Sequence, residues 1–571
     1  MIGTYGAVVA VCAASLTIGQ AAIALCGRRC WSWLAPAVGL ALLLVICWGT
    51  VRLPGEGAVS AVAVLLLTVA SIAYLRGRVE GAGEALRTGG PVALVALLAC
   101  SLPFLVEGHF GILGTSFNPD MSQHLLVADR LAEGQSSQLL NQGYPLGPHA
   151  VVVALNKGLG IGLVQGFGGL TIAIAILASL TALAAFRELP ALPRTAGALL
   201  VGLAYVVASY FAQGAFKETM QALSLLAFVL ALREADRSWG DLPLRFVPAA
   251  LIAVGSVYAY SFPGLIWLGG AAVLWAVVSR PAVRPLALSM LAFLVLVLPE
   301  MGRMIDFQQF ETFDPNGPGL GNLFGQISPF EALGIWPSGD FRLAPGDGAV
   351  PAIGYYLGIA FGLTLFVYGL VQLWRRRESA ILAGLGAAVL AYAAARTVGT
   401  PYTAAKAIEI GTPLVALTIL LPLLGAIDWR VRQPAVDKAA KRWLALAAAA
   451  LFAAAAGVST LLVLVNAPVG PTSYSSTLSE FRKAVGEGPT LVLASSQLLE
   501  EEHGTPFLAW ELRGGRVCIE STDETGELPA GVRFVISKEE DWVLRRVGDP
   551  LPGKSPCPLI AERQARQGPA R

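Results

Sequence analysis

The sequence predicts a mostly α-helical protein, in which a polytopic bundle of about 14 transmembrane helices carries a small C-terminal α/β domain. Three observations lead to this fold class. Hydrophobic residues make up 55% of the 571 residues and charged residues only 14%, whereas a soluble domain carries about 25% charged residues. The mean hydropathy is +0.65, which is typical of a membrane protein. The remaining charges are concentrated in residues 467–571, which we therefore expect to form a water-soluble domain beside a membrane domain at 1–466.

The predicted spans are stretches of about 20 mostly apolar residues, the length at which a helix crosses a bilayer. One further segment, 149–165, is apolar but contains Asn156, Lys157 and several glycines, so we expect a short, partly inserted helix there. The candidate spans, in chain order, are 5–26, 33–51, 57–75, 91–106, 166–186, 195–213, 219–232, 246–262, 264–279, 285–299, 351–374, 379–395, 402–427 and 443–466.

The basic residues between the spans predict how the chain is oriented in the membrane. With the N-terminus outside, the cytoplasmic loops hold 20 of the 28 Lys and Arg residues that precede position 467, as the positive-inside rule requires. Two long loops, 107–148 and 300–350, then face outward together with the C-terminal domain. We therefore expect a multi-pass cell-membrane protein with both termini and its active site on the extracytoplasmic side.

The C-terminal domain alternates helix-like and strand-like segments. Helices are predicted at 476–485 and 497–512, and strands at 490–494, 515–520 and 532–537. This alternation favours a β-α-β layer. Because no glycine-rich phosphate loop stands at a strand-to-helix junction, nucleotide binding has no support.

Charge and cysteine usage exclude other classes of protein. The net charge is only +2 and no basic run is interleaved with aromatic residues, which disfavours nucleic acid as a partner. The seven cysteines have no metal-binding spacing, and five of them lie in or beside apolar segments, where a small buried residue is expected. Cys518 and Cys557 both fall in the C-terminal domain, where an extracytoplasmic location permits a disulfide between them.

The first long external loop holds three of the four histidines and an acidic residue beside a proline. Asp120 lies near a predicted helix start, which suits a carboxylate because the helix dipole is positive there. Residues 122–133 have an amphipathic pattern that predicts a helix lying on the membrane surface. Asp120 and His124 are four residues apart and share one face of such a helix. They are the candidate catalytic residues; the alternative is a helix cap for Asp120 and a surface position for His124.

This loop resembles part of a known family. The run Asp120-x-x-x-His124, a short helix ending in Ala132-Glu133-Gly134, and the segment Tyr144-Pro145-Leu146-Gly147-Pro148-His149 resemble the first external loop of GT-C glycosyltransferases. The resemblance implies a GT-C-like fold and transfer of a sugar from a polyprenyl-phosphate carrier. It also implies that Asp120 is the general base or a metal ligand. Many members carry paired acids where Pro119-Asp120-Met121 stands here, so a divalent metal ion on Asp120 and His124 stays open as the one implied cofactor.

A phosphate-bearing donor needs cations, and cations are costly to place near lipid. The outer side of the membrane domain has few of them, so we expect the donor phosphate to be bound by Lys217, Arg303, Arg396 and Lys406. Polar residues beside these cations and in the first loop are the substrate-binding candidates, namely Tyr144, Glu218, Tyr402 and Glu409.

The alternative for each lysine is an internal ion pair. Lys217 is next to Glu218 in the sequence, and Lys406 shares a predicted helix face with Tyr402 and Glu409, at the spacing i, i+4 and i+7. Either carboxylate would neutralise its neighbour and leave no charge for a ligand. The residues Gly399-Thr400-Pro401-Tyr402 are also predicted to interrupt a pair of helices.

The sequence therefore favours a membrane glycosyltransferase that moves a sugar from polyprenyl phosphate to an acceptor on the outer face. The acceptor would be a glycan, a lipid or a protein of the cell envelope, which the C-terminal domain would help to hold. A transporter or lipid flippase is a second hypothesis; it predicts internal repeats, which the sequence does not contain. A non-catalytic scaffold whose tail binds a wall component is a third.

Overall fold

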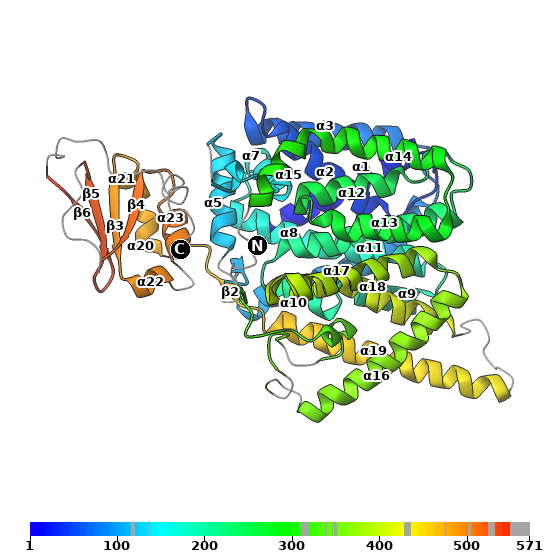
Figure 1. The fold of residues 1–571 in the computed structure, drawn as a ribbon. Coiled ribbons are helices and arrows are strands. Elements are labelled where there is room, and N and C mark those ends of the chain that lie inside the picture. The colour runs from blue at the N-terminus through cyan, green and yellow to red at the C-terminus, as the bar shows by residue number, and fades with distance from the viewer. Residues whose placement is uncertain are drawn as a thin grey trace.

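The computed structural model describes residues 1–115, 120–135, 138–309, 319–336, 340–344, 347, 351–427, 436–473, 475–500, 504–522 and 531–548. In this part of the chain, nine helical segments are long and apolar enough to cross a membrane. They form most of the bundle in Figure 1. These segments are α1 (Ile2–Leu25), α3 (Glu56–Leu75), α4 (Ala82–Val106), α8 (Leu163–Phe186), α14 (Val283–Val297) with η1 (Leu298–Glu300) and α15 (Met301–Asp306), α16 (Ala352–Arg375), α17 (Ser379–Val398), α18 (Pro401–Gly425) and α19 (Val436–Val465).

Every one of the predicted spans overlaps a helix, yet length and composition support nine or ten crossings instead of about 14. The difference has three causes. Three apolar helices have 14 to 16 residues, which at 1.5 Å per residue is shorter than the roughly 30 Å of hydrocarbon in a bilayer. The segment 195–213 is broken into two helices that bend by 53°. The predicted span 219–232 lies in a helix that has charged residues at both ends. The helices concerned, with the charged helix α11, are α2 (Ala35–Thr50), α9 (Ala191–Gly202), α10 (Tyr205–Ala212), α11 (Phe216–Arg237), α12 (Val247–Tyr260) and α13 (Gly264–Ser279).

The ambiguous segment 149–165 contains a short helix, as expected. Helix α7 (Gly147–Leu159) has 13 residues and ends at Gly160, whose φ is +66°. Its side chains are buried from Gly147 to Leu155, and the next helix, α8, follows after two more residues. At about 20 Å, α7 is shorter than the hydrocarbon layer.

Helices α1 and α2 approach each other at backbone distance because each has a glycine at the crossing. A Cβ on Gly39 would lie 1.7 Å from the carbonyl oxygen of Ser15, and a Cβ on Gly19 would lie 1.9 Å from that of Ala35. We expect Gly39→Ala to destabilise the protein by about 1–3 kcal/mol, because one of the two backbones must move. The measurement is thermal unfolding of the purified protein in detergent.

Gly49→Ala is the matched control for that substitution. Gly49 lies in the same helix, and a Cβ there would meet nothing within 4 Å. Alanine is also the better helix former by about 1 kcal/mol, so this variant should unfold at the wild-type temperature or above. Equal destabilisation by both substitutions would show that the α1–α2 crossing is not the cause.

The C-terminal domain is a four-stranded sheet with its own hydrophobic core, which includes Leu478, Val492 and Ile536. The strand order is β4-β3-β5-β6, with β3 parallel to β4 and β5, and β6 antiparallel to β5. The strands expected from the sequence are β3 (Thr490–Ala494), β4 (Val517–Ser521) and β5 (Phe534–Lys538), whereas β6 (Trp542–Arg546) was not predicted. The helices are α20 (Ser476–Glu480), α21 (Arg482–Val485), α22 (Ser496–Glu500) and α23 (Thr505–Glu511).

Two contacts join this domain to the membrane part. Strand β2 (Val469–Gly470) pairs antiparallel with β1 (Ile112–Leu113) of the first external loop. Helix α23 packs on α5 (Met121–Ala132), and Arg513 Nε lies 3.7 Å from Asp129 Oδ1. Figure 1 places α5 between the sheet domain and the helical bundle.

The expectation that α5 lies on the membrane surface is therefore wrong. Its buried side chains, among them Leu125 and Ala128, belong to the core of the membrane part. Leu126 packs instead against the core of the C-terminal domain. The amphipathic pattern is real, but the second face of the helix meets protein and not lipid headgroups.

Cys518 forms a disulfide. The partner proposed from the sequence, Cys557, lies outside the described residues. The other cysteines in the described part, Cys12, Cys26, Cys30, Cys47 and Cys100, are free.

Candidate active site

A cavity of about 670 Å³ lies where the ends of several helices meet beside α5. The starts of α5, α11 and α18 and the ends of α12 and α17 contribute to its wall. This arrangement follows from the sequence, because Pro401 ends one helical run and begins α18, and Gly214 with φ +71° separates α10 from α11. Seven of the predicted site residues line the cavity, namely Asp120, His124, Tyr144, Lys217, Glu218, Tyr402 and Lys406.

An ion pair between two helices forms part of the cavity wall. Lys406 Nζ of α18 lies 3.0 Å from Glu218 Oε1 of α11. The ammonium group also lies 4.2 Å from the centre of the Tyr402 ring, a cation–π contact. The two pairs that adjacency in the sequence suggested, Lys217 with Glu218 and Lys406 with Glu409, are not the ones formed; Lys406 reaches across to the other helix.

Glu409 lies one turn deeper on α18 and is completely buried. Neither of its carboxylate oxygens has a hydrogen-bond partner among the described residues. It does not line the cavity. A buried carboxylate without a partner is costly when charged, and Glu409 has no contact with the cavity through which it could bind a ligand there.

Lys217 is held by Tyr144. Its Nζ donates a hydrogen bond to Tyr144 Oη and lies 3.9 Å from the centre of the same ring. Burial, with smaller contributions from the nearby carboxylates of Glu218 and Asp120, raises the pKa of Tyr144 well above its usual range. The phenol therefore stays protonated, and the ammonium group of Lys217 stays unneutralised by it.

Asp120 immediately precedes α5 at the cavity wall and is exposed. His124, one turn further on, is buried, and its Nδ1 lies 3.1 Å from Nε2 of His149. Burial lowers the pKa of His124 well below its ordinary value, and the charges of Lys217 and Lys406 lower it further. His124 is therefore a neutral imidazole, which can accept or donate a hydrogen bond but cannot supply charge to a phosphate.

The described residues do not form a metal site. They contain no group of three or more His, Cys, Asp or Glu side chains able to hold a metal ion. His124 Nδ1 is already engaged by His149. A divalent metal on Asp120 and His124 therefore stays a prediction, and the mechanism proposed below uses none.

Arg303 and Arg396, the other two predicted phosphate ligands, are not among the residues that line the cavity. Arg303 donates hydrogen bonds to the carbonyl oxygens of Leu140 (2.9 Å) and Tyr144 (2.7 Å), so it fixes the segment that carries Tyr144. Arg396 donates to the side chain of Gln326 in the second external loop. Both arginines therefore hydrogen-bond residues of the external loops and do not face the cavity.

Other residues of the cavity were not selected from the sequence. Gln213, Tyr260 and Asn322 line its polar part, and Ile266 and Val398 its apolar part. Tyr260 lies in an aromatic-rich run at the end of α12, Tyr258-Ala259-Tyr260-Ser261-Phe262. This run is the sequence signal that could have identified Tyr260. Gln213 and Asn322 carry no comparable signal.

One edge of the cavity is apolar and exposed. Ile266 of α13 is 55% exposed, and Val398 of α17 is 78% exposed. Ala394 of α17 belongs to the same edge. Exposed apolar side chains on membrane helices face lipid, so the cavity has a polar interior and one apolar side open to lipid.

The second external loop contains a buried acid away from the cavity. Glu331 in η4 (Pro329–Leu333) is 4% exposed, and among the described residues only its Oε1 has a partner, the hydroxyl of Tyr355 at 3.3 Å. Burial raises the pKa of Glu331 to about 8. Between its ordinary value of 4.5 and about 8 the folded state holds a proton that the unfolded state has lost, so stability falls as pH rises through that window.

We expect Glu331→Gln to remove this pH dependence. Glutamine keeps the size and stays neutral, so the difference in unfolding temperature between pH 5 and pH 8 should be smaller in the variant. The slope that it removes is at most about 1.4 kcal/mol per pH unit. Thermal unfolding at several pH values measures it, and parallel curves for the two proteins would contradict the role of Glu331.

No protein-family model and no curated protein sequence matches the chain. Among solved structures, the fold is similar to the cryo-EM structure of the arabinofuranosyltransferase AftD from mycobacteria, at 15% sequence identity and a TM-score of 0.49. The matched region covers 79% of this chain and 35% of that one, so the chain spans about a third of the length of this structural neighbour. A similarity at this level is too distant to indicate a reaction.

Proposed function

We propose that this protein is a membrane glycosyltransferase that takes a sugar from a polyprenyl-phosphate donor. The observation that carries the proposal is the composition of one cavity. It joins an exposed carboxylate at a helix start, two half-buried lysines and an apolar edge open to lipid. Its volume of about 670 Å³ lies in the range of small-molecule sites, roughly 300–1,000 Å³.

In this proposal the donor enters from the side of α13 and α17. Its prenyl chain lies along Ile266 and Val398, and its phosphate reaches the lysines. Lys217 carries the charge that Tyr144 leaves unneutralised, whereas Lys406 shares its charge with Glu218. Lys217 is therefore the main phosphate ligand, and the Lys406–Glu218 pair orients the site.

Asp120 acts as the general base. Its carboxylate accepts the proton of an acceptor hydroxyl while the hydroxyl oxygen attacks the anomeric carbon of the sugar. The bond between that carbon and the phosphate oxygen breaks, and polyprenyl phosphate leaves with the bonding electrons. Lys217 stabilises the negative charge that develops on the leaving phosphate.

The acceptor is a glycan, lipid or protein of the cell envelope. The C-terminal domain contacts the catalytic loop through α23 and α5, next to the residue that would receive the acceptor proton. We therefore assign the domain a part in holding the acceptor at the cavity. The reaction takes place on the extracytoplasmic side, where the sequence locates this loop.

The test uses the full chain, purified and reconstituted in lipid nanodiscs, with a panel of radiolabelled polyprenyl-phosphate sugars and an envelope extract as acceptor. We expect one donor to be consumed, with its label transferred to the acceptor or slowly released by hydrolysis. If a donor binds but is never consumed, the protein is not the proposed transferase and the scaffold hypothesis is favoured. A donor that crosses the bilayer of a vesicle chemically unchanged would identify a flippase.

A further inference from the structure

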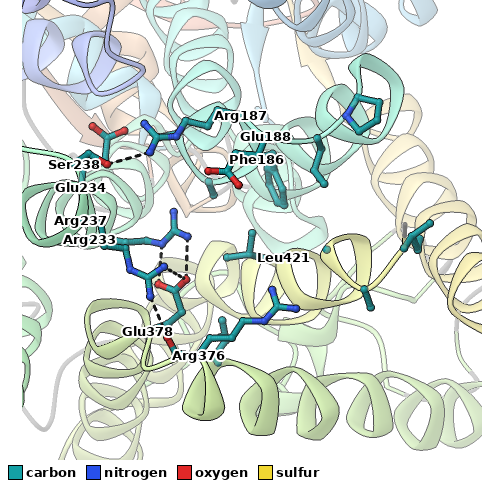
Figure 2. Close-up of a pocket in the computed structure, with 18 residues that line it drawn as sticks. Phe186, Arg187, Glu188, Arg233, Glu234, Arg237, Ser238, Arg376, Glu378 and Leu421 are labelled. Atoms are coloured by element: carbon teal, nitrogen blue, oxygen red, sulfur yellow. Dashed lines mark hydrogen bonds and ion pairs between the residues drawn. The ribbon is translucent and has the colours of Figure 1, made fainter. Parts of the chain in front are cut away.

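A second cavity, of about 1080 Å³, lies at the other end of the bundle. Helix α11 passes both cavities, and Lys217 and Arg233 on it are 16 residues apart, which is about 24 Å along a helix. The ends of α8, α11, α16 and α18 surround this second cavity (Figure 2). The loop charges predict that this end of the bundle faces the cytoplasm.

One wall of this cavity is fixed by a buried carboxylate. Glu378, which is 4% exposed, accepts hydrogen bonds from Arg233 Nε at 2.8 Å and Arg233 Nη2 at 2.9 Å. Arg237 Nη1 lies 2.9 Å from the same carboxylate. Figure 2 shows both guanidinium groups converging on Glu378. One negative charge is thus matched by two positive ones, and the wall keeps a net positive charge.

Two further arginines add to that charge. Arg187 donates to the hydroxyl of Ser238 at 3.0 Å, and neither Arg187 nor Arg376 forms an ion pair within the described part of the chain. The other buried acid at the cavity, Glu234, pairs with Arg28. A basic residue at one helix C-terminus is favoured by the helix dipole. With Glu234 paired to Arg28, four arginines from three helix ends stand against the carboxylates of Glu378 and the exposed Glu188 in this cavity. This leaves two positive charges in excess, which an anion would balance.

Between these charged groups, part of the wall is apolar. Phe186 and Leu373 are buried, and Leu421 and Leu189 are half-buried. A guanidinium group binds phosphate through two parallel hydrogen bonds. The neighbouring leucines cannot form hydrogen bonds to a small hydrated ion. The combination suits the phosphate of an amphiphile at the membrane surface, and basic pockets between membrane helices bind anionic lipid headgroups in this way.

We propose that this cavity binds a phosphate group, with Arg187 and Arg376 as the ligands. The apolar wall favours the headgroup of an anionic phospholipid in the cytoplasmic leaflet over free phosphate. The proposal does not depend on the reaction at the other end of the bundle.

The test measures ligand-induced stabilisation of the purified full chain in detergent, by thermal unfolding. The probes are phosphatidylglycerol, phosphatidylcholine and inorganic phosphate. Three variants are compared with wild type: Arg187→Gln, Arg376→Gln and the control Arg375→Gln. Arg375 has the same charge on the neighbouring residue at the end of α16 but does not line the cavity.

We expect phosphatidylglycerol to raise the unfolding temperature of wild type and Arg375→Gln with the same midpoint. In Arg187→Gln and Arg376→Gln the midpoint should move to about tenfold higher lipid concentration, since each loses one charged ligand. If only inorganic phosphate stabilises the protein, the cavity binds phosphate but the assignment of a lipid headgroup as its ligand is wrong. Equal midpoints in all variants would mean general attraction to a basic surface and would overturn the site itself, as would no stabilisation by any probe.

Discussion

Asp120→Asn should lower the turnover number of sugar transfer by a factor of about 10² to 10⁴, the usual contribution of a general base. Asparagine keeps the size of the side chain and its place before α5, but it cannot accept the acceptor proton. In the proposed mechanism the lysines bind the donor phosphate, so the KM for the donor should change little. A loss confined to kcat indicates an interaction made in the transition state. The measurement is initial rate against donor concentration.

Asp129→Asn is the matched control, with the same substitution on the same helix. Asp129 faces Arg513 of the C-terminal domain at 3.7 Å and does not line the cavity. Both side chains of this pair are about a quarter exposed, and a partly exposed ion pair contributes little to stability. The activity of Asp129→Asn should remain within a factor of a few of wild type. If Asp120→Asn also kept wild-type turnover, Asp120 would have no part in the chemistry.

The second large effect is expected for Lys406→Gln. Glu218 is 6% exposed and its carboxylate lies 3.0 Å from Lys406 Nζ, so the substitution leaves a buried negative charge without its partner. Removal of one member of a buried pair costs about 3–5 kcal/mol. We expect a large fall in unfolding temperature together with loss of transfer, because the remaining carboxylate repels the donor phosphate.

The double variant Glu218→Gln with Lys406→Gln tests the cause of that effect. It removes both charges, so stability should recover in large part while activity stays low. Lys157→Gln is the control for an exposed pair: Lys157 Nζ lies 2.8 Å from Glu133, but both side chains are about a third or more exposed. Such pairs contribute about 0–1 kcal/mol. Comparable destabilisation by Lys157→Gln and Lys406→Gln would contradict the importance of burial.

Charge in an apolar context was the most useful signal for the candidate site. Lys217 and Lys406 stand out because an ammonium group near lipid is costly unless it has a purpose, and both line the cavity. The same reasoning selected Arg303, which hydrogen-bonds loop carbonyls instead. A sequence cannot distinguish these two uses of a cation, because each depends on which backbone or carboxylate lies opposite after folding.

The sequence also could not predict which distant residues form ion pairs. Lys406 and Glu218 are far apart in the chain, and their neighbours in sequence offered simpler partners. The expected position of α5 failed for the same reason: an amphipathic pattern tells that one face is apolar but not whether lipid, the bundle or a distant domain covers the other. Helices, in contrast, were predicted well, because long apolar runs have few alternatives in a membrane.

The pairing of β1 with β2 and the packing of α23 on α5 also affect the order in which the protein matures. The membrane helices emerge from the ribosome first, but the loop beside the cavity obtains its neighbours only when residues 469–512 have been synthesised and have reached the same side of the membrane. The contacts that support this loop are therefore completed last, although the residues that line the cavity, from Asp120 to Lys406, are all made earlier. A chain interrupted after α19 would insert its helices and yet lack one support of the loop that carries Asp120.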